Sequence, residues 1–332
     1  MTREGRKVLV TGAGGFIGTH LVRHQLDLGR QVVATDIDLR SMEDLAPAEK
    51  LICAEFDIRD SSAFRPHLEE CDTVFHLAAA HLDVLKGAAD FHEINAAASA
   101  RLARTAAAAG VRRFVHCSSA GVFGALRALP ANEYTIPAPE IPYERSKLAG
   151  EAAVRDAASE SGLEAVILRP AWVYGPGCPR THKLIRTVAR RRFFFVGESN
   201  NLRHPLYVED FLQALELAAT SNVPTGEMAI IAGPDTVTVR QLVELIVEEL
   251  GIDFRPLTVP VALMRPVCLA VEALAGLVGK EPPFSRRSLK FFTDSAAFDT
   301  GKARKLLGMS PATTTRAGIR LTIDHFRQRG EL

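Results

Sequence analysis

The beginning of the chain holds the feature that most restricts its fold, a glycine-rich turn between an apolar run and an amphipathic stretch. Residues 7–11 (KVLVT) predict a strand, residues 16–28 predict a helix that Gly29 ends, and residues 31–35 predict a second strand. Two strands joined by a helix are typical of a parallel βαβ unit, because parallel strands need a crossover connection. We therefore expect an α/β domain here.

The alternation of strand and helix continues as far as Pro170. Three more buried strands are predicted from DTVFHLAA, RRFVHCSS and EAVILRP, and an alanine-rich helix ended by Gly110 precedes the second of them. This order is typical of a doubly wound parallel sheet. After Pro170 glycines and prolines interrupt the pattern. We predict one domain over residues 1–170, with a returning segment at about 205–232, and a smaller mixed α/β substrate domain from residues 171–204 and 233–332.

The composition argues against several other classes of protein. A formal net charge of +1 over 332 residues gives no general attraction to nucleic acid or anionic membranes. Five scattered cysteines lack the spacing of a disulfide framework or a zinc site, so we expect reduced thiols and no metal. The apolar run near residue 8 is too short for the core of a signal peptide, and we expect a cytoplasmic protein.

Residues 257–279 are apolar apart from Arg265 and Glu272. The two charges, together with Pro260 and Pro266, argue against a membrane-spanning helix, which needs about 20 uninterrupted apolar residues. We predict that this segment forms the core of the smaller domain. Contact with a membrane surface or a lipophilic ligand is the alternative interpretation.

The glycine-rich turn fits the pattern G-x-x-G-x-x-G through Gly12, Gly15 and Gly18, with Phe16 and Ile17 between the last two glycines. Glycines permit a tight turn and a close approach of the backbone, so that a pyrophosphate can rest on free N–H groups at a helix N-terminus. A strand precedes this turn and a helix follows it, as a dinucleotide site requires. We predict that these five residues bind a dinucleotide.

Asp36 lies at the end of the second predicted strand, about twenty residues after the turn, where a dinucleotide site places an acid against the adenosine ribose. A carboxylate accepts hydrogen bonds from a 2′-hydroxyl and repels a 2′-phosphate, which favours NAD over NADP. Arg40 lies close by and is the reason to keep NADP as the alternative. Asp57 and Ile58 are predicted to flank the adenine, although Asp57 is equally well interpreted as a surface acid.

Tyr143 and Lys147 are four residues apart at the start of a predicted helix (PYERSKLAGE). Side chains at positions i and i+4 lie on the same helical face, so the phenol and the ammonium can reach one point. The spacing alone is weak evidence, because an exposed helix edge has the same pattern. Other segments of the chain decide between the two interpretations.

Four segments together, TGAGGFIG, HLAA, CSSAGVFG and YERSK, resemble the extended short-chain dehydrogenase/reductase superfamily, in its NAD-dependent epimerase/dehydratase group. RPAWVYGPG, RHPLYVEDF and KARKLLGMSP are similar to segments of that group and occur in the same order, so the resemblance covers almost the whole chain. It implies a Rossmann sheet, a bound NAD, and a place for Ala78 and Ala79 of HLAA in the cofactor site.

The resemblance also implies the roles of the chemical groups. Tyr143 would be the general acid and base, and Lys147 would lower its pKa and donate to the nicotinamide ribose. Ser119 would hold the substrate oxygen, since it is the serine directly before AGVFG, whereas Ser118 could simply end the strand. Asn95 matches a helix residue that organises the site, with a helix N-cap as the alternative.

Three functions remain open at this stage. The first is a dehydrogenase or reductase of a secondary alcohol or ketone, similar to 3β-hydroxysteroid dehydrogenases and dihydroflavonol reductases. The second is a nucleotide-sugar 4-epimerase, and the third is a dinucleotide-sensing module without catalysis. A 4,6-dehydratase is disfavoured. Such enzymes have an Asp–Glu pair that removes water at the position where this chain has Ala120 and Gly121.

Two residues point to different substrates. Trp172 stands where epimerases usually have an asparagine, and its large apolar face favours a flatter, less anionic substrate. Arg203 matches an arginine that contacts the nucleotide diphosphate in epimerases, although a surface arginine is the plain alternative. We favour the dehydrogenase or reductase. The resemblance further implies a homodimer packed through helices at about 95–109 and 143–158.

Overall fold

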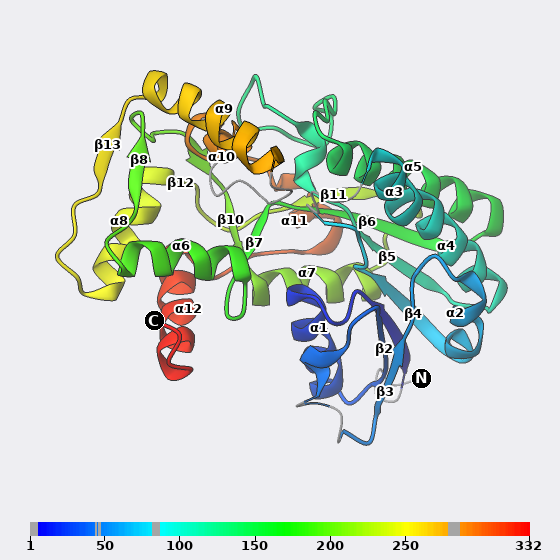
Figure 1. Cartoon of the computed structure of the whole chain (residues 1–332). Helices are drawn as coiled ribbons and strands as arrows, with labels where there is room; N and C mark the ends of the chain where they lie inside the picture. Colours follow the sequence, from blue (N-terminus) through cyan, green and yellow to red (C-terminus); the bar gives the residue numbers. More distant parts are fainter. Residues whose placement is uncertain (1–5, 44, 46–47, 82–86, 278–285) are drawn as a thin grey trace.

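A seven-stranded parallel sheet forms the centre of the computed structural model (Figure 1), which describes residues 6–43, 45, 48–81, 87–277 and 286–332. Its strand order is β11-β6-β5-β4-β1-β2-β3. The strands are β1 (Lys7–Thr11), β2 (Gln31–Asp36), β3 (Leu51–Glu55), β4 (Cys71–His76), β5 (Arg113–Cys117), β6 (Glu164–Pro170) and β11 (Met228–Ile231). The chain order reverses between β1 and β4, so the predicted doubly wound Rossmann sheet is confirmed.

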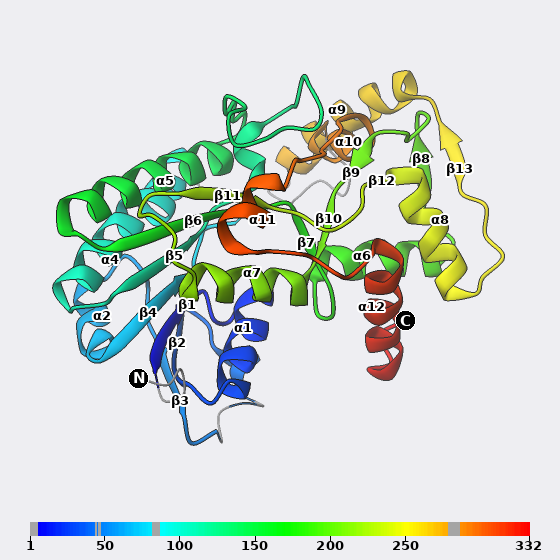
Figure 2. The same ribbon diagram turned by 180° about the vertical axis from the view of Figure 1, so that it is seen from behind.

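Helices cover both faces of this sheet (Figures 1 and 2), because its strands alternate buried residues between two cores. Val8 and Val10 pack in the core with α1 (Phe16–Asp27) and α7 (Val208–Thr220), whereas Leu9 packs in the core with α2, α4 and α5. The last three helices span Ser61–Leu68, Ala98–Ala108 and Pro142–Ser161. A short helix α3 (Ala88–His92) and a π-helical turn (Glu93–Ala97) lead into α4.

The chain beyond β6 builds a smaller second part from three two-stranded sheets, which pair β7 with β10, β8 with β13 and β9 with β12. Their strands are β7 (Trp172–Tyr174), β8 (Phe194–Val196), β9 (Leu202–Arg203), β10 (Pro205–Tyr207), β12 (Val237–Thr238) and β13 (Leu257–Val259). The helices of this part are α6 (Pro179–Ala189), α8 (Val239–Leu250), α9 (Val261–Leu277), α10 (Arg286–Thr293) and α12 (Thr315–Gln328).

Two later segments return to the main sheet. Helix α7 packs against α1, and β11 pairs with β6, within the range for which the sequence predicts a returning segment. Helix α11 (Gly301–Leu307) also returns, since Ala303, Leu307 and Met309 are buried in the core below β11 and α7. The second return is not evident from the sequence, because the helix has only seven residues and three of them, Lys302, Arg304 and Lys305, are charged.

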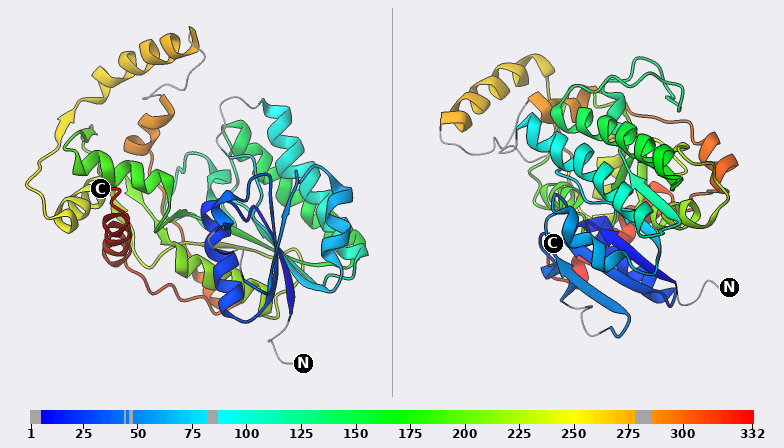
Figure 3. Two further views of the ribbon diagram at one scale, coloured as in Figure 1. Left: turned by 60° about the horizontal axis from the view of Figure 1, so that its bottom comes forward. Right: turned by 90° about the vertical axis from the view of Figure 1, so that its right-hand side faces the viewer.

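The apolar segment predicted at residues 257–279 forms β13 and α9, and its residues 278 and 279 lie outside the described residues. Met264 and Cys268 are buried against α10, whereas Leu263, Val267 and Leu269 are exposed. Helix α9 therefore buries one stripe and leaves another in solvent, at the edge of the molecule (Figure 3). Within the described ranges, no helix is both long and apolar enough to cross a membrane.

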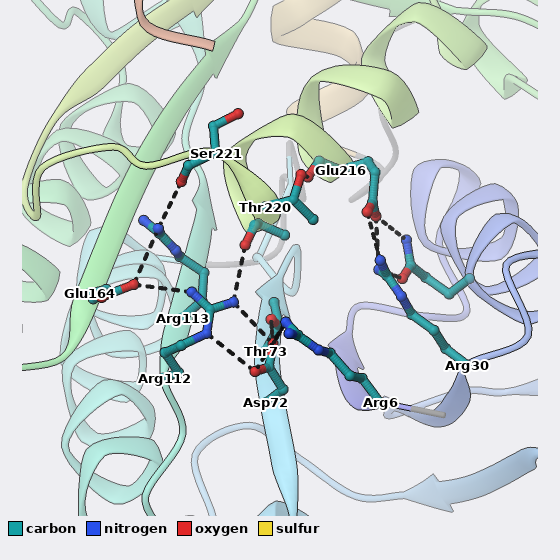
Figure 4. A network of polar contacts seen from close by, with 12 residues as sticks. Arg6, Arg30, Asp72, Thr73, Arg112, Arg113, Glu164, Glu216, Thr220 and Ser221 are labelled. Atoms are coloured by element: carbon teal, nitrogen blue, oxygen red, sulfur yellow. Dashed lines mark hydrogen bonds and ion pairs between the residues drawn. The ribbon is translucent and has the colours of Figure 1, made fainter. Parts of the chain in front are cut away.

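Charged side chains tie the amino ends of the strands together (Figure 4). Asp72 at the start of β4 accepts from Arg6 and Arg112, and Glu164 at the start of β6 pairs with Arg112 and Arg113. Since all these residues lie at the beginnings of parallel strands, they are at the edge opposite to the carboxyl ends, where α/β proteins bind ligands. The network is therefore structural.

Arg30 and Glu216 form the most buried pair of this network, with 5% and 18% of their side chains exposed. The guanidinium donates two hydrogen bonds to the Glu216 carboxylate, at 2.8 and 2.6 Å, and so links the turn before β2 to α7. Breaking a buried pair leaves one charge without compensation, which costs much more than losing an exposed pair.

We predict that Glu216→Gln lowers the free energy of unfolding by about 3 kcal/mol, because the Arg30 guanidinium stays charged and loses its counter-ion. The matched control is Glu160→Gln, which breaks the exposed Arg104–Glu160 pair and should cost less than about 1 kcal/mol. Denaturant unfolding of both variants measures the difference. Equal losses for the two variants would contradict the assignment.

Candidate active site

The carboxyl ends of the central strands open on a cavity of about 790 Å³, whose far wall comes from the second part of the chain. The predicted site residues that line it are Gly12, Gly15, Phe16, Ile17, Gly18, Asp36, Asp57, Ile58, Ala78, Ala79, Ser119, Tyr143, Lys147 and Trp172. Asn95 and Arg203 are not among its lining residues. The cavity runs from the glycine-rich turn to the start of α5 and α6.

The glycine-rich turn has no room for side chains. Gly12 has φ +71°, and a Cβ there would lie 2.6 Å from the backbone nitrogen of Ala78, in the segment that follows β4. A Cβ on Gly18 would collide with the carbonyl oxygen of Gly12. Gly14, which the sequence pattern does not single out, is equally crowded by Asp38, and its N–H donates to Asp36. The turn therefore leaves its backbone open toward the cavity.

Asp36 ends β2 at the cavity wall and is half-buried. Its carboxylate accepts from the N–H groups of Gly14 and Ile37, at 3.0 and 2.7 Å, and burial raises its pKa. Arg40 is exposed and forms an ion pair with Asp38, so this guanidinium is already compensated. Two acids and one paired arginine leave little positive charge for a 2′-phosphate.

Asp57 forms an ion pair with Arg59 at the surface, while its neighbour Ile58 is buried at the cavity wall. Asp57 also lines the cavity. Its position therefore agrees both with a surface acid and with a residue beside the adenine site. Ala78 and Ala79 follow β4 and line the same cavity as Ile58.

Asn95 lies in the π-helical turn and is buried, so the alternative that it caps a helix is wrong; Gly87 caps α3 instead. The Asn95 amide accepts from the N–H of Ala80 at 2.7 Å and donates to the Ala80 carbonyl at 3.1 Å. It also donates to the hydroxyl of Ser146 on α5, at 2.9 Å. Asn95 therefore joins the loop after β4 to the helix of Tyr143, behind the cavity wall.

The two consecutive serines after β5 have different environments. Ser118 is buried and donates to the Glu151 carboxylate at 2.5 Å. Ser119 is half-buried, accepts from the N–H of Gly121 at 3.0 Å, and its hydroxyl acts to lower the pKa of the Tyr143 phenol. The hydroxyl that faces the phenol is therefore that of Ser119.

Tyr143 is the second residue of α5, which begins at Pro142 and is capped by the Glu144 carboxylate on the N–H groups of residues 140 and 141. Lys147 follows one turn later and is buried, and its ammonium donates to the Cys117 carbonyl at 2.6 Å. The predicted helical face is thus present. In this state the ammonium holds the end of β5.

Burial raises the pKa of Tyr143 to about 12, so the net shift is opposite to the one expected from the charge of Lys147 alone. The hydrogen bond with Ser119 and the positive charge of Arg180 favour the phenolate, but the loss of solvation is larger. Burial likewise lowers the pKa of Lys147. The phenol therefore needs additional positive charge nearby before it can give up its proton at neutral pH.

Glu151 continues the same face of α5 one turn after Lys147 and is fully buried. Its carboxylate receives two hydrogen bonds from Arg169 on β6, at 2.8 and 2.7 Å, in addition to the one from Ser118. The Arg169 guanidinium lies over the ring of Phe123, 4.9 Å from its centre. This cluster fixes α5 against the ends of β5 and β6.

The two predicted substrate residues of the second part lie in different places. Trp172 lines the cavity and packs edge-on against Phe291, with 6.2 Å between ring centres. Arg203 is turned away and donates to the carbonyls of Asp294, Lys290 and Phe291 at the end of α10, while burial lowers its pKa to about 10. Its terminal nitrogens are therefore used within the protein.

Two residues at the cavity are not singled out by the sequence analysis. His81 lies edge-on to Tyr143, with 5.0 Å between ring centres, and the only sequence signal is its position just after HLAA. Arg180 lines the cavity at the start of α6 and acts on the charge of Tyr143. It follows the glycine–proline break after β7, where the chain must cross from the main sheet to the second part.

Comparisons with known proteins agree with this architecture. The model of the NAD dependent epimerase/dehydratase family matches residues 8–232. The chain is 30% identical to the sterol demethylase protein B of Methylococcus capsulatus, over 97% of this chain and 98% of that protein. It is 25% identical to 3beta-hydroxysteroid-dehydrogenase/decarboxylase isoform 1 of Arabidopsis thaliana, over 98% of this chain and 81% of that protein.

Sugar-nucleotide enzymes are also similar. The chain is 31% identical to the UDP-glucose 4-epimerase of Mycolicibacterium smegmatis, over 98% of this chain and all of that protein (100%). Among solved structures, UDP-glucose 4-epimerase of Thermotoga maritima with UDP-glucose has a TM-score of 0.78 at 26% identity, covering 98% and 100% of the two chains. MoeE5 in complex with UDP-glucose and NAD has a TM-score of 0.76 at 28% identity, covering 97% and 99%.

Proposed function

The chain belongs to the NAD dependent epimerase/dehydratase family, and from that premise we propose that it is an NAD-dependent dehydrogenase of a 3β-hydroxysteroid or a similarly flat secondary alcohol. The observation that carries this proposal is the state of Arg203, whose terminal nitrogens bind backbone carbonyls instead of facing the cavity. In this position Arg203 does not offer its guanidinium to a nucleotide diphosphate, as the matching arginine of an epimerase would.

The cavity fits NAD. Its glycine-rich turn lines the cavity with Gly12, Gly15 and Gly18, which carry no side chains, and a pyrophosphate can therefore approach the N–H groups of the α1 N-terminus. Asp36 would bind the adenosine ribose, and Ile58, Ala78 and Ala79 would enclose the adenine. When bound, NAD supplies the site for hydride transfer.

Ser119 and Tyr143 would hold the substrate oxygen between a hydroxyl and a phenol that line the same cavity. In the oxidation, the Tyr143 phenolate would take the proton of the alcohol. Lys147 would leave the Cys117 carbonyl or share its three N–H donors between that carbonyl and the cofactor ribose, because an ammonium can donate three hydrogen bonds. Its charge would then favour the phenolate.

The apolar character of the substrate end supports a steroid over a sugar nucleotide. Trp172 offers a flat indole face, and the apolar side chains of Phe298 and Leu126 also line the cavity. Among the described lining residues, Lys147 and Arg180 are the lysine and arginine side chains available to an anion. Because Lys147 is proposed to act with Tyr143, only the guanidinium of Arg180 would remain among these lining residues to bind a diphosphate, which carries two negative charges.

The second candidate is a UDP-hexose 4-epimerase, and the 31% identity to the Mycolicibacterium smegmatis enzyme favours it. The two candidates share the proposed cofactor site and the proposed roles of Ser119, Tyr143 and Lys147. They differ in what happens to the cofactor, because an epimerase returns the hydride to its substrate and a dehydrogenase must exchange its cofactor in each turnover.

We predict that Tyr143→Phe lowers the turnover number by about 100- to 10,000-fold, the range typical of a lost general acid or base. NADH binding, followed by fluorescence titration, should change little, since the phenolic oxygen is proposed to face the substrate. The matched control is Tyr134→Phe, because Tyr134 is 91% exposed and does not line the cavity. Wild-type turnover in the Tyr143 variant would refute its role.

The substrate proposal is tested on protein purified without added nucleotide. We expect much less than one NAD per chain after denaturation, and we expect formation of NADH and a 3-ketosteroid in equal amounts when NAD⁺ and a 3β-hydroxysteroid are added. Nearly one NAD per chain, with interconversion of UDP-glucose and UDP-galactose and no steroid oxidation, would establish the epimerase instead.

We also propose that the protein is a homodimer in the cytoplasm. Helices α4 and α5 lie side by side on one face of the sheet (Figures 1 and 2), and small partly exposed residues such as Ala149, Ala152 and Ala153 permit another helix to approach. The five free cysteines support a reducing compartment. Sedimentation equilibrium should give twice the mass of the chain, and Ala152→Arg should give the mass of one chain.

A further inference from the structure

Three apolar residues that line the cavity adjoin the end of α10. Ala296 and Phe298 come from the stretch directly after this helix, whereas Trp172 comes from β7, much earlier in the chain. Phe291, near the end of α10, packs edge-on against the Trp172 indole, with 6.2 Å between ring centres. The position of the end of α10 therefore affects where all three lining residues lie.

Arg203 lies on β9, beside the end of α10 (Figure 2). Its guanidinium donates to the carbonyls of Asp294, Lys290 and Phe291, at 2.9, 3.0 and 2.5 Å. The same guanidinium lies over the Phe291 ring, 5.0 Å from the ring centre. The last carbonyls of a helix have no partner within the helix, and a positive charge beside them is favourable. Arg203 thus closes α10 and contacts the ring that packs on the indole.

The neighbours of this arginine extend the contact. Asn201 donates to two of the same carbonyls, at 3.0 and 2.8 Å. The Leu202 carbonyl accepts from the N–H of Ala296 at 2.9 Å. Nδ1 of His204 accepts from the N–H of Phe298 at 3.2 Å. Residues 201–204 therefore bind the end of α10 and the lining residues that follow it.

Lys290 joins the same helix to the main part of the chain. Its ammonium forms an ion pair with Glu140, in the segment before α5, and both side chains are exposed. Exposed pairs contribute little to stability, because water and salt screen them. The partly buried hydrogen bonds of Arg203 are therefore the stronger hold on the end of α10.

We propose that Arg203 is a positioning residue, which fixes the end of α10 and, through Phe291, sets the place of Trp172 in the cavity. It builds the cavity wall and does not touch the ligand, unlike the arginine that the resemblance implies. A planar guanidinium is suited to this task, because its fork reaches several carbonyls at once while its face covers an aromatic ring. The expected effect on substrate rests on the proposed function, whereas the effect on the indole does not.

The fluorescence of Trp172 reports on this wall directly, because the chain contains one tryptophan. Arg203→Gln should release the end of α10, so that the emission of the indole moves to longer wavelength and acrylamide quenches it more strongly. Phe291→Leu should give the same change, since it removes the ring that covers the indole. Arg203→Lys should fall between, because it keeps the charge and loses the fork.

Kinetics with a 3β-hydroxysteroid provide the second measurement. Arg203→Gln should raise KM by about 3- to 10-fold, the change in affinity that corresponds to one aromatic contact. The turnover number and the affinity for NADH should change by less than about twofold, because this wall is separate from the proposed catalytic and cofactor residues. A general loss of folded structure would not raise KM alone.

A double-mutant cycle tests whether Arg203 acts through Phe291. In the Phe291→Leu background, Arg203→Gln should have little further effect on the emission or on KM, since residues that act through one contact are not additive. If Arg203→Gln does not fold, Arg203→Lys takes its place in the same cycle.

The matched control is Arg240→Gln. Arg240 lies over the ring of Phe195, 4.3 Å from its centre, and donates to the Glu198 carbonyl at 3.1 Å. It therefore makes the same two kinds of contact in the second part of the chain, and none of these three residues lines the cavity. Its substitution should change neither the emission of Trp172 nor KM.

The outcomes separate this inference from the proposed function. Unchanged emission in Arg203→Gln, unchanged KM, or additive effects in the cycle would each overturn the positioning role. If the wild type epimerised UDP-glucose and did not oxidise the steroid, the proposed function would fail and KM would be measured for UDP-glucose. A rise of that KM without a change in emission would show that Arg203 binds the diphosphate itself, which also overturns the positioning role.

Discussion

The fully buried carboxylate of Glu151 holds the candidate active site together, because it joins its own helix to two other segments of the chain. It belongs to α5, receives the Arg169 guanidinium from β6 and receives the Ser118 hydroxyl from the turn after β5. Burying two charges is expensive unless every donor and acceptor is paired. Moving any one of these side chains would leave a buried charge or donor unpaired. The cluster therefore fixes α5 relative to the ends of β5 and β6.

The positions of the proposed catalytic residues Tyr143, Lys147 and Ser119 follow from the Glu151 cluster by the periodicity of the helix and the strand. Tyr143, Lys147 and Glu151 are spaced by four residues, so the anchored end of the face sets the position of the phenol two turns away. Ser119 follows directly after the anchored Ser118 and is turned to the opposite side, toward the phenol. One buried ion pair thus positions two groups that never touch it.

The sequence predicts the features that depend on short stretches of chain. The βαβ unit, the glycine-rich turn and the face of α5 are encoded locally, and the structure contains each of them at the predicted residues. Features that depend on distant burial are not predictable in this way. The raised pKa of Tyr143 comes from desolvation by several elements, Arg203 is captured by a helix about ninety residues later, and α11 returns to the sheet through long-range packing.

Negative side chains lie at one end of the cavity and positive side chains at the other. This separation of charge would orient both the proposed cofactor and the substrate in one cavity. At the end with the glycine-rich turn, Asp36 lines the cavity, whereas Asp38 beside it and Asp57 are compensated by Arg40 and Arg59, so Asp36 is the carboxylate that would repel further negative charge there. Lys147 and Arg180 lie at the other end, beside a phenol whose pKa burial has raised. A site with a phenol so reluctant to ionise needs positive charge at that end. The same charge that favours the phenolate would also attract an anionic group of a ligand, so the proposed proton transfer and the choice of ligand would depend on one electrostatic field.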